Sequence, residues 1–283
     1  MRVGIGLPTT TPGTTGELLT QWARRADAGP FASLGTLDRV VYRAFDPFAA
    51  LAAAAAVTQR VELVTMIVIA PIRPATLLAK QAASVHALSA GRLTLGLATG
   101  ARPDDYTATG ADGRTRGRRF DEQLEAIRVA WEEARTVPAA PDGGSGPPRI
   151  LVGGGSGPAF ARMARTADGY VHGGGPPRAF ASAASKAVAA WVDLGRPGRP
   201  LLYGQGYFAL GSAGDVDAGA DYLRDYYEFT GPFAEKVAAA NLSTPAAIRD
   251  FIRGYDEAGC DHLVLLPTVN HLDQSDRLAD VLA

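Results

Sequence analysis

The sequence lacks the features of a secreted, membrane-bound or nucleic-acid-binding protein. Its single cysteine, Cys260, cannot form an intramolecular disulfide, which favours a reducing cytoplasm. No segment offers the roughly 18 consecutive apolar residues of a membrane-spanning helix, and the opening MRVGIGLP lacks the long apolar stretch of a signal peptide. The formal net charge of −1 excludes the basic excess typical of nucleic-acid-binding proteins. We therefore expect a cytoplasmic protein with neither a membrane nor a nucleic acid as partner.

Motifs for metal binding and for nucleophilic catalysis are also missing. The four histidines form neither an HxH nor an HExxH pattern, so we expect no metal site. No GxSxG sequence provides a nucleophilic serine at a sharp turn. The positions of His86 and His262 suggest structural roles, whereas His172 follows an expected strand and is a candidate to contact a ligand.

Short apolar runs alternate with helix-length amphipathic segments through the whole chain. This alternation predicts a parallel sheet, and eight such units favour a closed (β/α)₈ barrel, or TIM barrel, over an open Rossmann-like sheet. The 283 residues suit a single barrel domain over 1–283, since such barrels need about 250 residues. The expected strands are Val3–Leu7, Phe31–Leu37, Val61–Ile69, Leu93–Ala98, Arg149–Val152, Gly169–His172, Leu201–Leu210 and His262–Leu266.

The expected helices lie between these strands. One Pro/Gly-rich stretch, Val137 to Pro148, interrupts the alternation; it could be a domain linker, but a surface loop is the better interpretation, because half a barrel would leave open sheet edges. The helices are expected at Glu17–Ala26, Pro47–Thr58, Pro74–Leu88, Arg118–Ala134, Pro158–Thr166, Pro177–Val192, Val216–Tyr227, Phe233–Ala240, Thr244–Ala258 and Ser275–Leu282.

Catalytic residues of such a barrel lie at the C-terminal ends of its strands. Asp38 and Arg39 end the second strand, either as a surface ion pair or as groups that position substrate and move a proton. His172 ends the sixth strand, and Tyr207 lies on the seventh in an alternating row of polar side chains. These four residues are the candidates for substrate and proton handling.

The run GGGSGP, Gly153–Pro158, lies between a strand and a helix start. Its backbone N–H groups, the Ser156 hydroxyl and the partial positive charge of the helix N-terminus suit a phosphate group. The alternative is a tight turn that binds nothing. The run matches neither a Walker A loop nor GxGxxG.

Three segments together resemble the luciferase-like flavin monooxygenase and F-420-dependent oxidoreductase superfamily. They are LVTMIVIAPIRPATLLAKQAASVHALSAGRLTLGLATGARPDDY, RGRRFDEQLEAIRVAW and PPRILVGGGSGPAFARMARTADGY. The resemblance implies a barrel with a flavin or deazaflavin ring in its mouth and a non-prolyl cis peptide at Met66–Ile67, against the ring. It also implies a phosphate at Gly154, Gly155, Ser156 and Gly157, and strand-end residues Ala98 and Thr99 near the cofactor.

The resemblance further implies an enzyme that uses reduced coenzyme F-420 or FMN on a small organic substrate. Hydride transfer with F-420 is slightly favoured; the alternatives are a monooxygenase that uses reduced FMN and oxygen, with a separate flavin or F-420 reductase as partner, and a non-catalytic flavin-binding protein. The acidic tail of F-420 would fit a basic groove, for which Arg149, Arg162 and Arg165 are candidates. A homodimer is expected, as is frequent in the family.

Two positions depart from the family pattern. Many members have a histidine after the acidic residue at the end of strand two, where this chain has Arg39. Light-emitting members have a basic residue where this chain has Thr99, so light emission is not expected.

Overall fold

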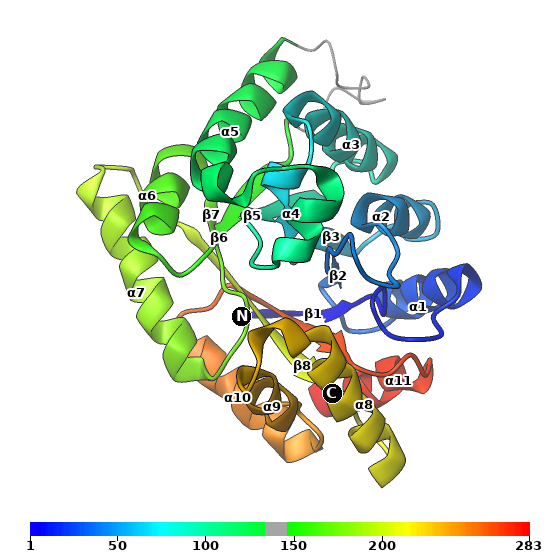
Figure 1. Cartoon of the computed structure of the whole chain (residues 1–283). Helices are drawn as coiled ribbons and strands as arrows, with labels where there is room; N and C mark the ends of the chain where they lie inside the picture. The colour runs from blue at the N-terminus through cyan, green and yellow to red at the C-terminus, as the bar shows by residue number, and fades with distance from the viewer. Residues whose placement is uncertain (134–145) are drawn as a thin grey trace.

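A closed barrel of parallel strands forms the centre of the molecule (Figure 1). The computed structural model describes residues 1–133 and 146–283. Its strand segments are β1 (Arg2–Gly6), β2 (Ser33–Thr36), β3 (Glu62–Thr65), β4 (Val68–Ile69), β5 (Leu93–Ala98), β6 (Arg149–Gly153), β7 (Gly169–Val171), β8 (Leu201–Phe208) and β9 (His262–Pro267). Because β3 and β4 both pair with β5, they occupy one barrel position, and the ring has eight positions.

Helices surround this barrel, as Figure 1 shows, which confirms the predicted (β/α)₈ fold. They are α1 (Gly16–Ala28), α2 (Pro47–Ala55), α3 (Ala75–Leu88), α4 (Pro103–Thr109), α5 (Arg116–Glu132), α6 (Gly157–Thr166), α7 (Pro177–Asp193), α8 (Ala213–Tyr226), α9 (Phe233–Ala239), α10 (Pro245–Glu257) and α11 (Asp273–Leu282). The expected surface loop falls mostly outside the described residues. Among the described helices, none has both the length and the apolar content to cross a bilayer.

Each strand is buried on both faces, and this explains the continuous apolar runs in the sequence. Leu34 and Leu63 face the helices, where they join the large outer core. Val64, Leu151 and Val264 face the barrel axis and join a smaller inner core. The barrel interior is therefore filled by side chains, and a ligand can reach the barrel only at its two ends.

Polar side chains close the barrel interior at the N-terminal ends of the strands. The partly buried Glu62 carboxylate accepts hydrogen bonds from the Tyr203 hydroxyl at 3.0 Å and from the Thr94 hydroxyl at 2.5 Å. The Ser33 hydroxyl and His262 Nε2 lie 2.7 Å apart and are fully buried. Burial lowers the pKa of His262 to about 4, so this ring is neutral at physiological pH. We call these five residues the barrel floor.

The third barrel position is broken between β3 and β4, where Met66 and Ile67 are joined by a cis peptide bond. Just before the break, Thr65 exchanges hydrogen bonds with Gly96 on β5: the Thr65 hydroxyl donates to the Gly96 carbonyl at 2.7 Å and accepts from the Gly96 amide at 2.8 Å. A Cβ on Gly96 would lie 2.2 Å from the Thr65 carbonyl oxygen. Gly96 therefore lets the two strands approach closely beside the break.

Replacing Gly96 by alanine is expected to lower the free energy of unfolding by about 1–3 kcal/mol, because backbone must move to admit the methyl group. Gly16→Ala is the matched control, since a Cβ there meets nothing within 4 Å. Chemical denaturation of both variants measures the difference. Equal stability of the two variants would contradict the close approach.

Candidate functional site

One side of the barrel mouth is built from backbone and small side chains. Ile67 and Thr99 are half-buried there, and Ala98 lies between the ends of β4 and β6. A Cβ on Gly96 would contact the Ile67 side chain at 3.2 Å, and one on Gly153 would contact Ala98 at 3.4 Å. Ile67, Ala98 and Gly153, with Gly96 between Ile67 and Ala98, therefore form a continuous wall, to which Met66 adds a buried side chain.

The glycine loop continues this wall outward. Gly154, Gly155, Ser156 and Gly157 are all exposed, and α6 begins at Gly157. Gly154 has φ of +127°, and a Cβ on Gly155 or Gly157 would meet nothing within 4 Å. The Ser156 hydroxyl makes no capping bond to the helix. The loop thus offers an open helix N-terminus and a free hydroxyl, the features that suit an anionic group.

Asp38 does not pair with its neighbour Arg39. Its carboxylate binds the Arg73 guanidinium through two hydrogen bonds, of 2.6 and 2.9 Å, and accepts the Ile69 amide at 2.8 Å. Burial raises the pKa of Asp38, while the Arg73 guanidinium acts in the opposite direction. These bonds tie the end of β2 to β4, just beyond the Met66–Ile67 peptide. The predicted role of Asp38 in substrate or proton handling stays a prediction.

Arg39 is 7% exposed and contacts side chains from α4. Its Nε lies 3.3 Å from Asp105 Oδ2, and its Nη2 donates to the Val41 carbonyl at 2.8 Å. The other Asp105 oxygen accepts the amides of Val40 and Val41, at 3.0 and 2.8 Å. This ion pair fixes the loop after β2. Arg39 Nε and Nη1 are buried without a hydrogen-bond partner among the described residues.

Tyrosines form the other side of the mouth. The Arg39 guanidinium lies over the rings of Tyr42 and Tyr226, at 5.0 and 5.2 Å. The hydroxyls of Tyr207 and Tyr227 are 2.7 Å apart, and Thr10 contacts the Tyr222 hydroxyl at 2.6 Å. We call Tyr42, Tyr207, Tyr222, Tyr226 and Tyr227 the tyrosine cluster. Tyr222 and Tyr226 come from the end of α8 and Tyr227 is its C-cap. These three were not predicted, although Tyr222 and Tyr226 stand four residues apart, on one helix face.

His172 is not brought together with the other three candidates. Its ring packs edge-on against Phe180 of α7 at 5.8 Å, and its Nδ1 lies 3.3 Å from the Tyr170 hydroxyl. The neighbouring Val171 faces the barrel axis, so His172 faces the helices instead. Burial lowers the pKa of His172, which leaves the ring neutral. Its predicted catalytic role gains no support from these contacts.

The three arginines considered for a basic groove do not form one. Arg162 and Arg165 both bind the carboxylate of Asp121, at 2.9 and 3.0 Å. Arg149 begins β6 and therefore lies at the opposite end of the barrel. No groove of these three residues faces the mouth.

A different basic cluster lies at the start of α5. The guanidinium groups of Arg116 and Arg119 make no hydrogen bond or ion pair within the described part of the chain, and both act electrostatically on Tyr106. The Tyr106 hydroxyl donates to the Thr99 carbonyl, so these arginines lie near the end of β5. Positive charge at a helix N-terminus is unfavourable unless an anion is present. These two arginines were not predicted as part of the site.

A cavity of about 710 Å³ lies beside the tyrosine cluster. Its walls come from the loops after β1 and β2 and from Asp225 of α8, which accepts a hydrogen bond of 2.5 Å from the Tyr42 hydroxyl. The volume is within the usual range of about 300–1,000 Å³ for small-molecule sites. The described residues contain no group of His, Cys, Asp or Glu suited to a metal ion.

Replacing Arg39 by alanine is expected to lower the free energy of unfolding by about 3–5 kcal/mol, because Asp105 would stay buried without its charge partner. Arg43→Ala is the control: Arg43 is exposed on the same loop, and its loss is expected to cost under about 0.5 kcal/mol. Urea denaturation measures both values. A loss below about 1 kcal/mol for Arg39→Ala would show that the pair does not hold the loop.

The curated relatives of this chain are uncharacterised. An uncharacterised protein of Mycobacterium tuberculosis is 38% identical over 146 residues, which cover 47% of this chain and 49% of that protein. A second one from the same species is 33% identical over 141 residues, which cover 46% and 50%. The chain thus spans about half the length of these relatives.

Solved structures share the fold over nearly the whole chain. Monooxygenase RslO1 from Streptomyces bottropensis is 23% identical with a TM-score of 0.75, covering 100% of this chain and 97% of that one. An F420-dependent secondary alcohol dehydrogenase, solved with an F420-acetone adduct, is 16% identical with a TM-score of 0.80, covering 99% and 97%. The sequence profile described as luciferase-like monooxygenase matches residues 1–266. With this match over most of its length, the chain belongs to the luciferase-like monooxygenase family.

Proposed function

We propose that this protein is an oxidoreductase that binds a reduced deazaflavin, coenzyme F-420, at the barrel mouth and transfers hydride between it and a small organic substrate. The observation that carries the proposal is the pairing of a small-residue wall with an exposed glycine loop at the same strand ends. A planar ring would lie against Ile67, Ala98 and Gly153, and the exposed Ser156 and Gly157 mark the start of α6.

The residues present fit such a cofactor. The Met66–Ile67 backbone and Thr99 would lie along the ring, and the amides of Gly155 to Gly157 with the Ser156 hydroxyl would bind its phosphate. The cofactor, when bound, supplies the two-electron chemistry. The chain supplies the orientation of the ring, the exclusion of water by the tyrosine cluster, and the proton.

The arginines at the start of α5 favour F-420 over FMN. F-420 carries an acidic tail, whereas FMN ends at its phosphate. Arg116 and Arg119 have no acidic partner among the described residues and lie near the strand end that would hold the ring. An acidic tail would relieve their unfavourable position at the helix N-terminus.

The tyrosine cluster is the best source of the proton. Burial raises the pKa of Tyr207 well above 10, so its hydroxyl stays protonated and acts as a hydrogen-bond donor at neutral pH. Tyr227 is its partner at 2.7 Å. Asp38 and Arg39, whose charges are bound to Arg73 and Asp105, would position the wall and the cluster. The substrate would enter from the cavity beside Tyr42.

Calorimetric titration with F-420 and with FMN tests the cofactor. We expect F-420 to bind more tightly than FMN. The double variant Arg116→Ala, Arg119→Ala is expected to lower the affinity for F-420 by about tenfold or more and to leave the affinity for FMN unchanged, because only F-420 has the acidic tail. Arg118→Ala is the matched control, since Arg118 already lies 3.7 Å from Glu122.

Other outcomes of this titration are equally informative. Tighter binding of FMN, with no effect of the double variant, would overturn the F-420 assignment and favour a monooxygenase that uses reduced FMN and oxygen, supplied by a separate reductase. The family description favours this alternative. Binding without turnover of any donor would point to a flavin-binding protein. A folded protein that binds neither compound contradicts the proposal as a whole.

Tyr207→Phe is expected to leave the Kd for the cofactor unchanged and to lower kcat by about 100-fold or more, because the proton donor is lost. The measurement uses F-420 and whichever substrate a screen of small alcohols, ketones and aldehydes identifies. Tyr222→Phe is the control, since its hydroxyl contacts Thr10 and not Tyr227. Equal kcat values for the two variants would remove Tyr207 from the reaction.

A further inference from the structure

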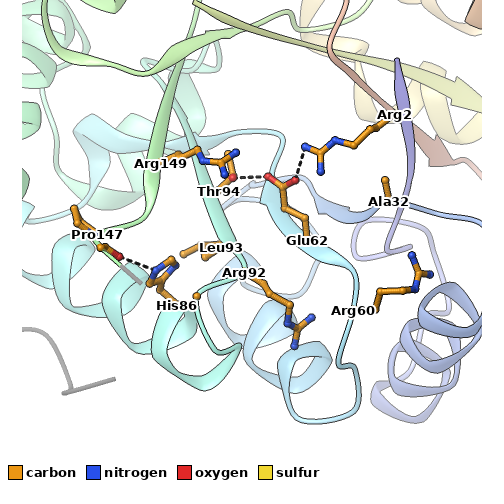
Figure 2. A pocket seen from close by; sticks show the side chains of 12 residues that line it. Arg2, Ala32, Arg60, Glu62, His86, Arg92, Leu93, Thr94, Pro147 and Arg149 are labelled. Carbon is orange, nitrogen blue, oxygen red and sulfur yellow. Dashed lines mark hydrogen bonds and ion pairs between the residues drawn. The ribbon is translucent and has the colours of Figure 1, made fainter. Parts of the chain in front are cut away.

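A second cavity, of about 320 Å³, lies at the N-terminal end of the barrel, opposite the mouth. Figure 2 shows it from close by, with Arg149 beside Thr94 on one side of Glu62 and Arg2 on the other. Four arginines line it, and Glu62 is the single carboxylate among its lining residues: Arg2, Ala32, Arg60, Glu62, His86, Gly91, Arg92, Leu93, Thr94, Gly146, Pro147 and Arg149. The proposed function assigns no role to this end of the barrel.

The carboxylate of Glu62 is already fully engaged. It accepts hydrogen bonds from Arg2 at 2.9 Å, Thr94 at 2.5 Å and Tyr203 at 3.0 Å. It therefore neutralises Arg2 and cannot neutralise the remaining three guanidinium groups as well. Both bonds of Arg2 use Nη2, so its Nε and Nη1 are left without a partner in the described part of the chain.

Two of the remaining arginines are held by neutral groups. Arg92 donates to the carbonyls of Ser89, Val61 and Thr58, at 2.8, 2.6 and 2.8 Å. Arg60 likewise donates to backbone carbonyls, among them Phe31 at 2.8 Å. Carbonyls satisfy the N–H groups but remove no charge. Asp27, which accepts the amides of Arg60 and Val61, is the nearby carboxylate that offsets part of this charge.

The guanidinium of Arg149 makes no hydrogen bond or ion pair with any described residue, although the residue lies opposite Thr94 in the strand register. It also borders a smaller hollow that contains Asp168 and Glu132, but neither carboxylate pairs with it. Burial lowers the pKa of His86, so His86 adds no charge to the cavity. Four guanidinium groups thus face two carboxylates, Glu62 and Asp27, which leaves two positive charges without compensation.

We propose that this cavity is an anion site for a doubly charged oxyanion, inorganic phosphate or the phosphate group of a monoester. Arg149 is its principal ligand, and the free N–H groups of Arg2 are the second. A dianion matches the uncompensated charge, and guanidinium groups bind phosphate oxygens through paired hydrogen bonds. The cavity is near the lower limit of small-molecule sites, which suits a phosphate group better than a whole cofactor. This inference is independent of the proposed function.

The test is a calorimetric titration with inorganic phosphate at low salt, carried out in a Ser156→Asp background. The added negative charge at the start of α6 prevents phosphate from binding to the glycine loop, so any remaining site lies elsewhere. We expect one site to remain, and its affinity to fall by about tenfold or more when Arg149→Ala is added. Arg149→Lys keeps the charge but not the paired hydrogen bonds, so its affinity for phosphate is expected to lie between those of the background and of Arg149→Ala.

Arg24→Ala is the matched control, because Arg24 is exposed on α1 and lies outside the cavity. It is expected to bind phosphate as the background variant does. A parallel titration with glycerol 3-phosphate distinguishes a phosphate monoester from inorganic phosphate as the ligand. Tighter binding of glycerol 3-phosphate than of inorganic phosphate indicates a monoester, and equal affinity for the two indicates free phosphate. Loss of all binding in the Ser156→Asp background, or full binding by Arg149→Ala, would overturn the proposal. Circular dichroism confirms that each variant is folded.

Discussion

The bidentate ion pair between Asp38 and Arg73 is the interaction on which the mouth of the barrel depends. It joins the end of β2 to the segment that follows the broken third strand, where hydrogen bonds of the sheet are interrupted. The Ile69 amide binds the same carboxylate. A buried carboxylate with such partners is costly to separate from its cation. The ion pair therefore maintains the position of Met66 and Ile67, which the strand pairing alone would leave less constrained.

Most of the fold was predictable from the sequence because its signals are local. Strand β5, Leu93–Ala98, was predicted with its observed ends, since parallel strands read as continuous apolar runs. Helix α4, Pro103–Thr109, was missed because it has fewer than two full turns and no apolar period. The third strand was expected to be continuous from Val61 to Ile69, and the structure divides it. That division follows the Met66–Ile67 peptide, whose cis bond only the family resemblance had indicated.

The site was less predictable, because strand ends identify positions and not partners. Asp38 and Arg39 are adjacent in sequence, yet they bind Arg73 and Asp105, which come from different elements. His172 follows a strand end but faces the helix layer, since the alternation of the strand directs Val171 inward. The tyrosines of α8 and the arginines of α5 lie far in sequence from the strands they approach. Contacts of this kind arise from tertiary packing, and composition or spacing does not reveal them.

The two sides of the mouth differ in what they are made of. The wall of Ile67, Ala98 and Gly153 is largely main chain held by the pairing of the barrel strands. The facing side consists of side chains, which come from α8 and its C-cap, from the loop after β2 and, in Tyr207, from β8. Main chain in a closed barrel tolerates little change, while side chains on a peripheral helix can be exchanged one at a time. Exchange of side chains on α8 would therefore alter this face of the mouth and leave the opposite wall intact.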